Sequence, residues 1–328
     1  MAYYYGRDWN GYAQDGNTSS AVSYTRDSHL ARIDYGFTAG NAYTGHVPDQ
    51  VAFGTGDRCF ATNCDPISSY ASNWPDVPYT QDYCAAGGSC QVTGPTFWST
   101  VRLASITTQQ WNGTTYAPVD SWSLSQSLPQ PADQTSPTLW LDSITHTGSD
   151  TTAGGSAVTL PKVTFTPVDQ QNRVNPGNYP GLDRFRIEQI TTETGAQISV
   201  SYELTNPCNP SSLPSPSADT SSCFPVYWQQ FTPTTGADWF NKYAVALVDV
   251  SDPTGGSPGL HTSYAYNSPA WHYDDNELVQ PKYRTYGQWR GYQTVYTYTG
   301  TGTDPLTKTK TGYYQGMDGT RCPPAPGR

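Results

Sequence analysis

Apolar and polar residues alternate along many short segments of this 328-residue chain. LARIDYGF, from Leu30 to Phe37, is one example. Alternation with a period of two residues is typical of a strand with one face buried and the other face exposed. The pattern predicts strands at Leu30–Phe37, Gln50–Gly54, Thr96–Trp111, Tyr116–Leu128, Thr138–Thr147, Val158–Val168, Arg184–Leu204 (a hairpin), Trp239–Val250, Leu260–Tyr266, Tyr283–Gly302 and Leu306–Gly316.

The segments between these strands predict turns and long loops. Asn112-Gly113 separates two alternating segments, and Asn-Gly in that position is the strongest short hairpin signal. Cys59–Cys90 carries closely spaced prolines, which disfavour a central strand. We therefore predict one all-β domain over residues 1–328, with possible sub-boundaries near 129–137 and 206–224. Residues 1–29 and 317–328 are expected to be frayed termini.

Composition strengthens the all-β prediction and excludes some classes of partner. The chain has 25 Tyr, 10 Trp, 27 Pro and 30 Gly, and only 13% of its residues are charged. Aromatic residues suit strands, whereas Pro and Gly suit turns. The net charge of −10 disfavours nucleic acid, because phosphate contacts require clustered Lys and Arg. The longest apolar segments, such as Tyr243–Val250, are too short to span a bilayer.

Cysteine spacing points to an oxidising compartment. Six of the seven cysteines form local couples, which favours disulfides. Free buried thiols and a zinc site are the alternatives, and the absence of Cys-x-x-Cys counts against zinc. The disulfide candidates are Cys59 with Cys64, Cys84 with Cys90, and Cys208 with Cys223. Cys322 is left over, and its partner is not defined by the sequence.

The first residues, MAYYYGRDWNGY, lack the basic and then apolar pattern of a secretory leader. Oxidised cysteines without a leader are explained most simply if the chain is a piece of a longer exported protein. We therefore expect it to be secreted or displayed at the cell surface as part of a parent protein. A cytoplasmic chain with reduced cysteines is the alternative.

No catalytic motif for nucleotide, zinc-protease or serine-hydrolase chemistry occurs, so we predict no catalytic residue, no cofactor and a non-enzymatic chain. The densest polar cluster contains Asp274, Asp275 and Glu277. These carboxylates are weak candidates for a cation site or, in a hydrolase, for acid–base catalysis. Adjacent strand residues point to opposite faces and the cluster lacks the Gly of a calcium loop, so a solvated turn is the plainer interpretation.

The stretch YRTYGQWRGYQTVYTYTG, beginning at Tyr283, is rich in aromatic residues with interleaved arginines. On a regular strand, Trp289 would face away from Tyr292, unless a bulge at Gly287 or Gly291 resets the register. Such a face packs across strands and can also stack on a sugar ring. The candidate ligand-binding residues are Arg284, Tyr286, Trp289, Arg290, Tyr292 and Tyr296.

Several stretches, in the same order, resemble the segment that precedes the repeats of actinobacterial RHS/YD-repeat proteins. This segment is similar to the middle region of the insecticidal-toxin B component and of SpvB-like proteins. The matching stretches are His29–Gly36, Gln50–Cys59, Trp74–Tyr79, Cys84–Cys90, Pro95–Leu103, Leu139–Thr147, Cys223–Trp228, Asp238–Tyr243, Ala270–Tyr292 and Tyr313–Gly319.

The resemblance implies a large, curved antiparallel sheet that leads into a hollow β-shell. It implies a non-enzymatic structural segment of a secreted, polymorphic-toxin-like protein, whose partner is a downstream YD-repeat shell of the same or a neighbouring chain. Some members are labelled carbohydrate-binding, so a carbohydrate-binding module that uses the Tyr/Trp face is the alternative. The chain departs from the full family, because it contains no run of Tyr-Asp repeats, no RHS core signature and no effector after RCPPAPGR.

Overall fold

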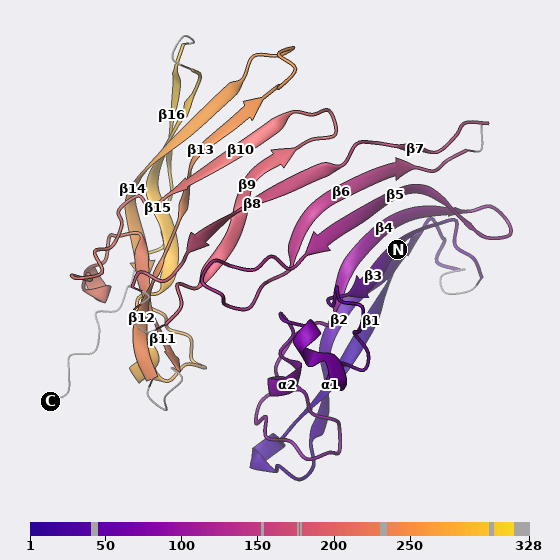
Figure 1. Cartoon of the computed structure of the whole chain (residues 1–328), viewed down its shortest axis with the longest axis horizontal. Coiled ribbons are helices and arrows are strands. Elements are labelled where there is room, and N and C mark those ends of the chain that lie inside the picture. The colour runs from indigo at the N-terminus through magenta and orange to yellow at the C-terminus, as the bar shows by residue number, and fades with distance from the viewer. Residues whose placement is uncertain are drawn as a thin grey trace. The chain divides into compact units, whose positions relative to one another are not determined.

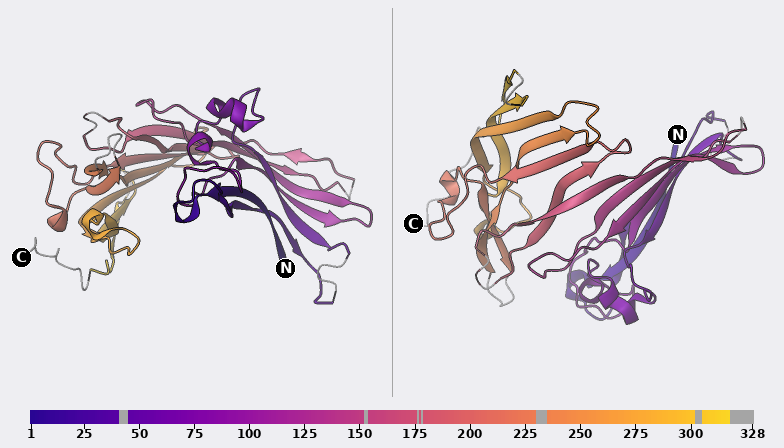
Figure 2. Two further views of the ribbon diagram at one scale, coloured as in Figure 1. Left: turned by 90° about the horizontal axis from the view of Figure 1, so that it is seen from below. Right: turned by 45° about the horizontal axis from the view of Figure 1, so that its top comes forward.

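The computed structural model describes residues 1–40, 45–151, 154–175, 177, 179–229, 235–301 and 305–317. Its strands form one 14-stranded antiparallel sheet with the order β1-β2-β3-β4-β5-β6-β8-β9-β10-β13-β14-β15-β16, in which β7 pairs with β6 (Figures 1 and 2). A separate hairpin consists of β11 and β12. The sheet is not closed. The prediction of an all-β fold built on a large antiparallel sheet is therefore confirmed.

The strands are β1 (Ala2–Tyr12), β2 (Val22–Tyr35), β3 (Asp49–Asp57), β4 (Val101–Trp111), β5 (Tyr116–Ser127), β6 (Trp140–Gly148), β7 (Val158–Thr159), β8 (Val163–Gln171), β9 (Asp183–Thr191), β10 (Gln197–Glu203), β11 (Cys223–Gln229), β12 (Thr235–Asn241), β13 (Ala244–Ser251), β14 (Leu260–His272), β15 (Gln288–Thr299) and β16 (Thr307–Gly312). The short helices are α1 (Ile67–Tyr70) and α2 (Tyr79–Asp82), with 3₁₀ turns at Gln14–Gly16, Ala71–Asn73, Pro216–Ala218 and Pro281–Tyr283.

Most predicted strands are present, although β11 was not predicted and Trp239–Val250 is divided between β12 and β13. The predicted strand at Val158–Val168 is divided into β7 and β8 around Pro161, which has no N–H to donate to a ladder. The Asn112-Gly113 turn does connect β4 to β5, with Gly113 at a φ of +96°. The Asn112 side-chain oxygen accepts hydrogen bonds from the N–H groups of Thr114 and Thr115, which stabilises this turn.

Where a frayed N-terminus was expected, the structure has β1 paired with β2 over the whole of Ala2–Tyr12. The alternation in β1 was obscured because three of its four exposed positions carry aromatic residues, whereas the other face includes Asp8 and Asn10. Of the predicted C-terminal fray, only residue 317 lies within the described part of the chain. Cys322 lies outside the described residues.

Contacts divide the chain into two compact units. Unit 1 comprises Met1–Gln130 and Ser136–Thr164, and unit 2 comprises Pro131–Thr135 and Phe165–Arg328. One division falls inside the predicted sub-boundary at 129–137, whereas 206–224 lies within unit 2.

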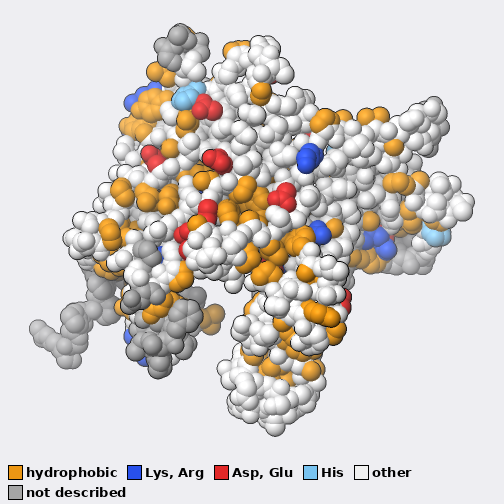
Figure 3. Space-filling view, in the orientation of Figure 1, with side chains coloured by type: hydrophobic (Ala, Val, Ile, Leu, Met, Phe, Trp, Pro, Cys, Tyr) orange, Lys and Arg blue, Asp and Glu red, His pale blue; other side chains and the backbone are white. Residues whose placement is uncertain are grey.

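In unit 1, two disulfides form the centres of small apolar clusters. Cys59–Cys64 packs with Trp74 and Val77. Cys84–Cys90 packs with Ala13 and Ala21, in the connection between β1 and β2. Both clusters lie in the loop segment that carries α1 and α2 and in the adjoining β1–β2 connection. Hydrophobic side chains also show on the surface of the lobe at the bottom of Figure 3. A loop-rich segment thereby obtains a core that its few apolar residues could not supply without the cystines.

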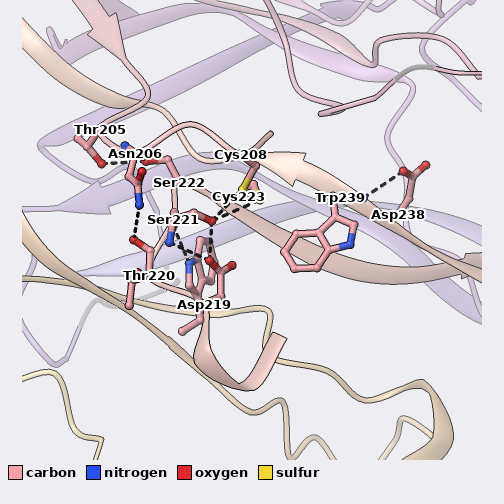
Figure 4. The surroundings of a disulfide bond; sticks show 11 residues. Thr205, Asn206, Cys208, Asp219, Thr220, Ser221, Ser222, Cys223, Asp238 and Trp239 are labelled. Atoms are coloured by element: carbon pink, nitrogen blue, oxygen red, sulfur yellow. Dashed lines mark hydrogen bonds between the residues drawn. A yellow bond between two sulfur atoms is a disulfide. The ribbon is translucent and has the colours of Figure 1, made fainter. Parts of the chain in front are cut away.

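In unit 2, the third disulfide, Cys208–Cys223, joins the Pro/Ser-rich loop to the first residue of β11 (Figure 4). All three predicted disulfide couples are therefore present. Cys223 is fully buried, and Trp239 and Trp271 are buried in the same unit. The Nε1–H of Trp271 donates to the backbone oxygen of Ser221 at 3.0 Å, so the loop is held against β14.

The central strands of the sheet lack the strict inside–outside alternation of a covered sheet. Nearly every residue of β4, β5 and β6 is half-buried, on both faces. A free-standing sheet domain normally buries one face completely against a second layer. Both faces of these strands therefore retain partly exposed area.

Candidate functional site

A bulge at Gly291 determines the arrangement of the predicted ligand-binding face. Trp289 lies opposite Trp271, and Tyr292 lies opposite Pro269. Two β15 residues, Arg290 and Gly291, therefore face a single residue of β14, and Gly291 has a φ of +76°. This extra residue brings Trp289 and Tyr292 into contact, with ring centroids 5.0 Å apart. A regular strand would place these two rings on opposite faces.

The rings of this face pack on one another rather than lining a surface. The ring of Trp271 contacts those of Phe224 at 4.9 Å and Trp289 at 4.6 Å, and the ring of Tyr292 contacts that of Tyr266 at 4.5 Å. Tyr292 is only 8% exposed, and its hydroxyl lies 3.0 Å from that of Thr205. The aromatic ladder formed by Phe224, Trp271, Trp289, Tyr292 and Tyr266 therefore connects β11, β14 and β15 through packing.

The other predicted ligand-binding residues lie apart from this ladder. Tyr286 is buried, and Arg284 donates from Nε to the backbone oxygen of Val279 at 2.7 Å. Arg290 is exposed and donates to the side chain of Gln288. Tyr296 lies directly opposite Lys310 on β16. The structure thus does not gather the six residues into one surface.

Asp274, Asp275 and Glu277 occupy the connection between β14 and the 3₁₀ turn at residues 281–283. Asp274 is half-buried and accepts hydrogen bonds from the N–H of Asn276 and the side-chain amide of Gln288, both at 3.1 Å. Asp275 and Glu277 are exposed. Within the described residues, no three His, Cys, Asp or Glu side chains are grouped so that they could hold a metal ion.

A different acidic group, which the sequence pattern did not identify, fixes the segment at residues 131–135. Asp133 accepts hydrogen bonds from the N–H groups of Thr135 and Asp183, and Asp169 accepts one from the N–H of Ala132. Burial and the charges of Asp133 and Asp169 raise the pKa of Asp183. Burial acts in the same direction on Asp133, but the hydrogen bonds outweigh it and lower its pKa. Because Asp133 and Asp169 bind backbone N–H groups, their role here is to hold the chain.

A second buried carboxylate lies beside the Cys208–Cys223 disulfide (Figure 4). One oxygen of Asp219 accepts the N–H of Ser221 at 2.7 Å and also its hydroxyl. The other oxygen is buried and has no hydrogen-bond partner among the described residues. Burial raises the pKa of Asp219, although the bonds from Ser221 act in the opposite direction. The Ser221 hydroxyl donates to the Asp219 carboxylate and lies against the two disulfide sulfurs, and within the described residues it has no hydrogen bond to a histidine, the usual base of such a nucleophile.

Each end of the sheet leaves one side of a strand without a partner strand in the described part of the chain. Within the described residues, β1 pairs only with β2, and β16 pairs only with β15. Each end strand therefore presents backbone N–H and C=O groups to whatever lies beside it, which makes it a template for another strand.

The β1 strand also carries an exposed aromatic row that the sequence analysis missed. Tyr3, Tyr5, Arg7 and Trp9 are all exposed, and the three aromatic side chains are each more than half accessible. Two register shifts occur in the β1–β2 pair, and in both the extra residue belongs to β2. The alternation of β1 itself is thus unbroken, and its odd-numbered side chains share one face.

At the opposite end, β16 alternates threonine with lysine. Lys308 lies opposite Tyr298 and Lys310 lies opposite Tyr296, and the Lys308 ammonium is 4.3 Å from the Tyr296 ring centroid. Both lysines are exposed. Lysines on an end strand limit uncontrolled strand pairing, because a second copy brings the same charges.

Comparison with protein-family models, with curated proteins and with solved structures finds no match. No helix in the described part of the chain is long and apolar enough to cross a membrane. The chemical case for a function therefore depends on the sheet, its two ends and its aromatic and charged side chains.

Proposed function

We propose that the chain is a non-enzymatic structural segment of an RHS-type β-shell, carried by a secreted or surface-displayed parent protein. Its sheet continues into strands of a downstream YD-repeat shell, which the same or a neighbouring chain provides. The ordered motifs that resemble the segment before YD repeats motivate this assignment.

The observation that supports the proposal is an open sheet whose end strands, β1 and β16, each pair on one side only within the described residues. A segment of a larger sheet requires such ends, because neighbouring strands satisfy their backbone groups. The half-buried central strands fit the same role, since a shell wall is covered by other parts of the assembly rather than by its own second layer. Three disulfides suit an oxidising environment.

Hydrogen exchange tests this proposal by comparing the 328-residue recombinant chain with the same sequence in material from its native source. We expect the amides of β1 or β16 to exchange quickly in the recombinant chain and to be protected in the native material. Amides of the central strand β5 should exchange alike in both samples. The proposed continuation would be contradicted if β1 and β16 exchanged equally fast in both samples and the native source contained this chain as a separate protein.

Carbohydrate binding is a second candidate, and the exposed row on β1 favours it. Tyr5 and Trp9 offer ring faces to solvent, as sugar stacking requires, whereas Tyr292 of the predicted face is buried. Glycan-array binding that is lost in Tyr5→Ala and Trp9→Ala, but retained in the exposed control Tyr314→Ala, would support this function. An array without signal for the unmodified chain would remove it.

A further inference from the structure

A cavity of about 530 Å³ lies in unit 2, between the β11–β12 hairpin and the residues around the β8–β9 connection. The N–H of Asn241 donates to the backbone oxygen of Asn172, and the N–H of Val174 donates to that of Trp239 at 2.9 Å. These bonds hold the hairpin against the connection and keep the walls of the cavity in place. Its volume suits a small organic ligand.

The cavity is lined by two cations that lack ion-pair partners. Arg186 and Lys242 both belong to its lining, and within the described residues neither lies within ion-pair distance of a carboxylate. By contrast, Arg26, Arg58 and Arg173 each pair with an aspartate. Both side chains are half-buried, so a bound carboxylate would offset part of the cost of burying their charges.

Arg186 is held in position while part of its donor set stays free. It donates to the side-chain oxygen of Asn172 at 2.7 Å and to the backbone oxygen of Arg184, and its guanidinium carbon lies 4.5 Å from the Tyr243 ring centroid. A guanidinium has five N–H donors, so donors remain for a ligand. Burial lowers the pKa of Arg186, and Tyr243, Tyr202 and Asp169 act against this effect in that order. A bound anion would offset the same cost of burial.

The remaining walls are mainly apolar. Phe224 and Val226 of β11 and Phe240 of β12 line the cavity together with Leu182. The Tyr243 hydroxyl donates to the backbone oxygen of Gln171 and is therefore already engaged. A ligand must then combine an anionic group for the cations with a ring or apolar face for the Phe224 and Phe240 side.

We propose that this cavity binds a ring-bearing organic carboxylate, whose carboxylate contacts Arg186 and Lys242 and whose ring lies against Phe224 and Phe240. Planar carboxylates match the fork of an arginine better than spherical anions do. The site is independent of the sheet ends, so it does not depend on the proposed structural role. Sugar acids and aromatic acids share the required chemistry.

Calorimetric titration of the full chain tests the site with four probes: benzoate, glucuronate, neutral glucose and inorganic phosphate. We expect at least one of the two acids to bind with a Kd of about 1 mM or below, and glucose to give no signal. Benzoate binding without glucuronate binding identifies an aromatic acid, and the reverse identifies a sugar acid.

The variants Arg186→Gln and Lys242→Gln should each weaken the binding of the acid by about tenfold or more, whereas Lys308→Gln on β16 should bind as the unmodified chain does. Should Arg186→Gln fail to fold, Lys242→Gln decides alone. The proposal is overturned if neither acid binds, if the cavity variants bind as tightly as the control, or if phosphate binds as tightly as the acids, since the ring walls would then contribute nothing.

Discussion

At the scale of single residues, the conformation of Gly291 has the largest effect on the aromatic ladder. Its φ of +76° permits the β15 bulge that places Trp289 beside Tyr292. A side chain at this position would meet no atom within 4 Å, so space is not the constraint. The constraint is the backbone, because residues with a Cβ rarely adopt positive φ.

Gly291→Ala should therefore lower the free energy of unfolding by about 1 to 2 kcal/mol through backbone strain alone. Gly312→Ala on β16 is the matched control, since that glycine also has open space around it but no positive φ. Urea denaturation of both variants measures the difference. Equal stabilities for the two variants would show that the bulge does not depend on Gly291.

Asp219 provides a second prediction at the residue scale, in its pH dependence. Burial raises its folded-state pKa above the ordinary value of 3.8, so the folded state holds this proton more tightly than the unfolded chain does. The protonated Asp219 side chain therefore stabilises the folded state below pH 3.8, and this stabilisation is lost as the pH rises through the raised folded-state pKa. Asp219→Asn keeps an acceptor for Ser221 and removes the titration.

We expect the stability of Asp219→Asn to fall less than that of the unmodified chain as pH rises from 3.8 toward neutrality. At neutral pH the variant should be equally stable or more stable, by about 1 kcal/mol, because the hydrogen bonds from Ser221 already offset part of the cost of burying the carboxylate. Thermal unfolding across this pH range measures both effects. Parallel curves for the two proteins would contradict the assignment.

At the scale of elements, the cystine loops supply packing that strands alone do not. The Cys84–Cys90 loop forms backbone hydrogen bonds to the connection between β1 and β2, from the N–H of Cys90 to Thr18 and from the N–H of Ala21 to Gly88. The cystine then packs on Ala13 and Ala21. The loop thus stabilises the turn that brings β1 back alongside β2.

Cys84→Ser combined with Cys90→Ser should lower stability by about 2 to 4 kcal/mol and speed hydrogen exchange in residues 13–21. The Cys208–Cys223 loop in unit 2 serves as the internal control, and its exchange should stay unchanged. Mass spectrometry after denaturation, with and without reduction, verifies which disulfides remain. Unchanged exchange at residues 13–21 would indicate that the cystine does not hold the β1–β2 connection.

At the scale of the whole molecule, the open sheet is the feature that matters for assembly. The β1 and β16 strands each pair on one side only within the described part of the chain. Their chemistry differs, because β1 presents an aromatic row and β16 presents lysines. The lysines should oppose self-association at that end, whereas a partner strand with acidic residues would be accepted.

Replacing both Lys308 and Lys310 with valine should therefore increase self-association, raising the dimer fraction about tenfold at a given concentration. Lys162→Val is the control, because that lysine is exposed but precedes β8 outside any strand. Light scattering coupled to size-exclusion chromatography measures the mass. A double variant that stays as monomeric as the control would show that charge does not protect this edge.

Much of the architecture follows from local pattern. Alternation located most strands, the Asn112-Gly113 turn identified the β4–β5 hairpin, and short cysteine spacing identified all three disulfides. Each of these depends on residues near one another in the chain, where backbone geometry limits the choices. The β1 strand was missed because three of its four exposed positions are aromatic and its other face carries Asp8 and Asn10, which inverts the usual pattern.

The sequence by itself determined that this chain is an all-β protein with three local disulfides. Only the tertiary structure decided which aromatic residues are packed and which face solvent, since one bulged residue at Gly291 reverses the faces of a strand. It also placed Arg186 of β9 and Lys242, which follows β12, in the lining of one cavity. The sequence does not predict that these two residues line one cavity, because the long-range pairing of strands, rather than local propensity, brings them there.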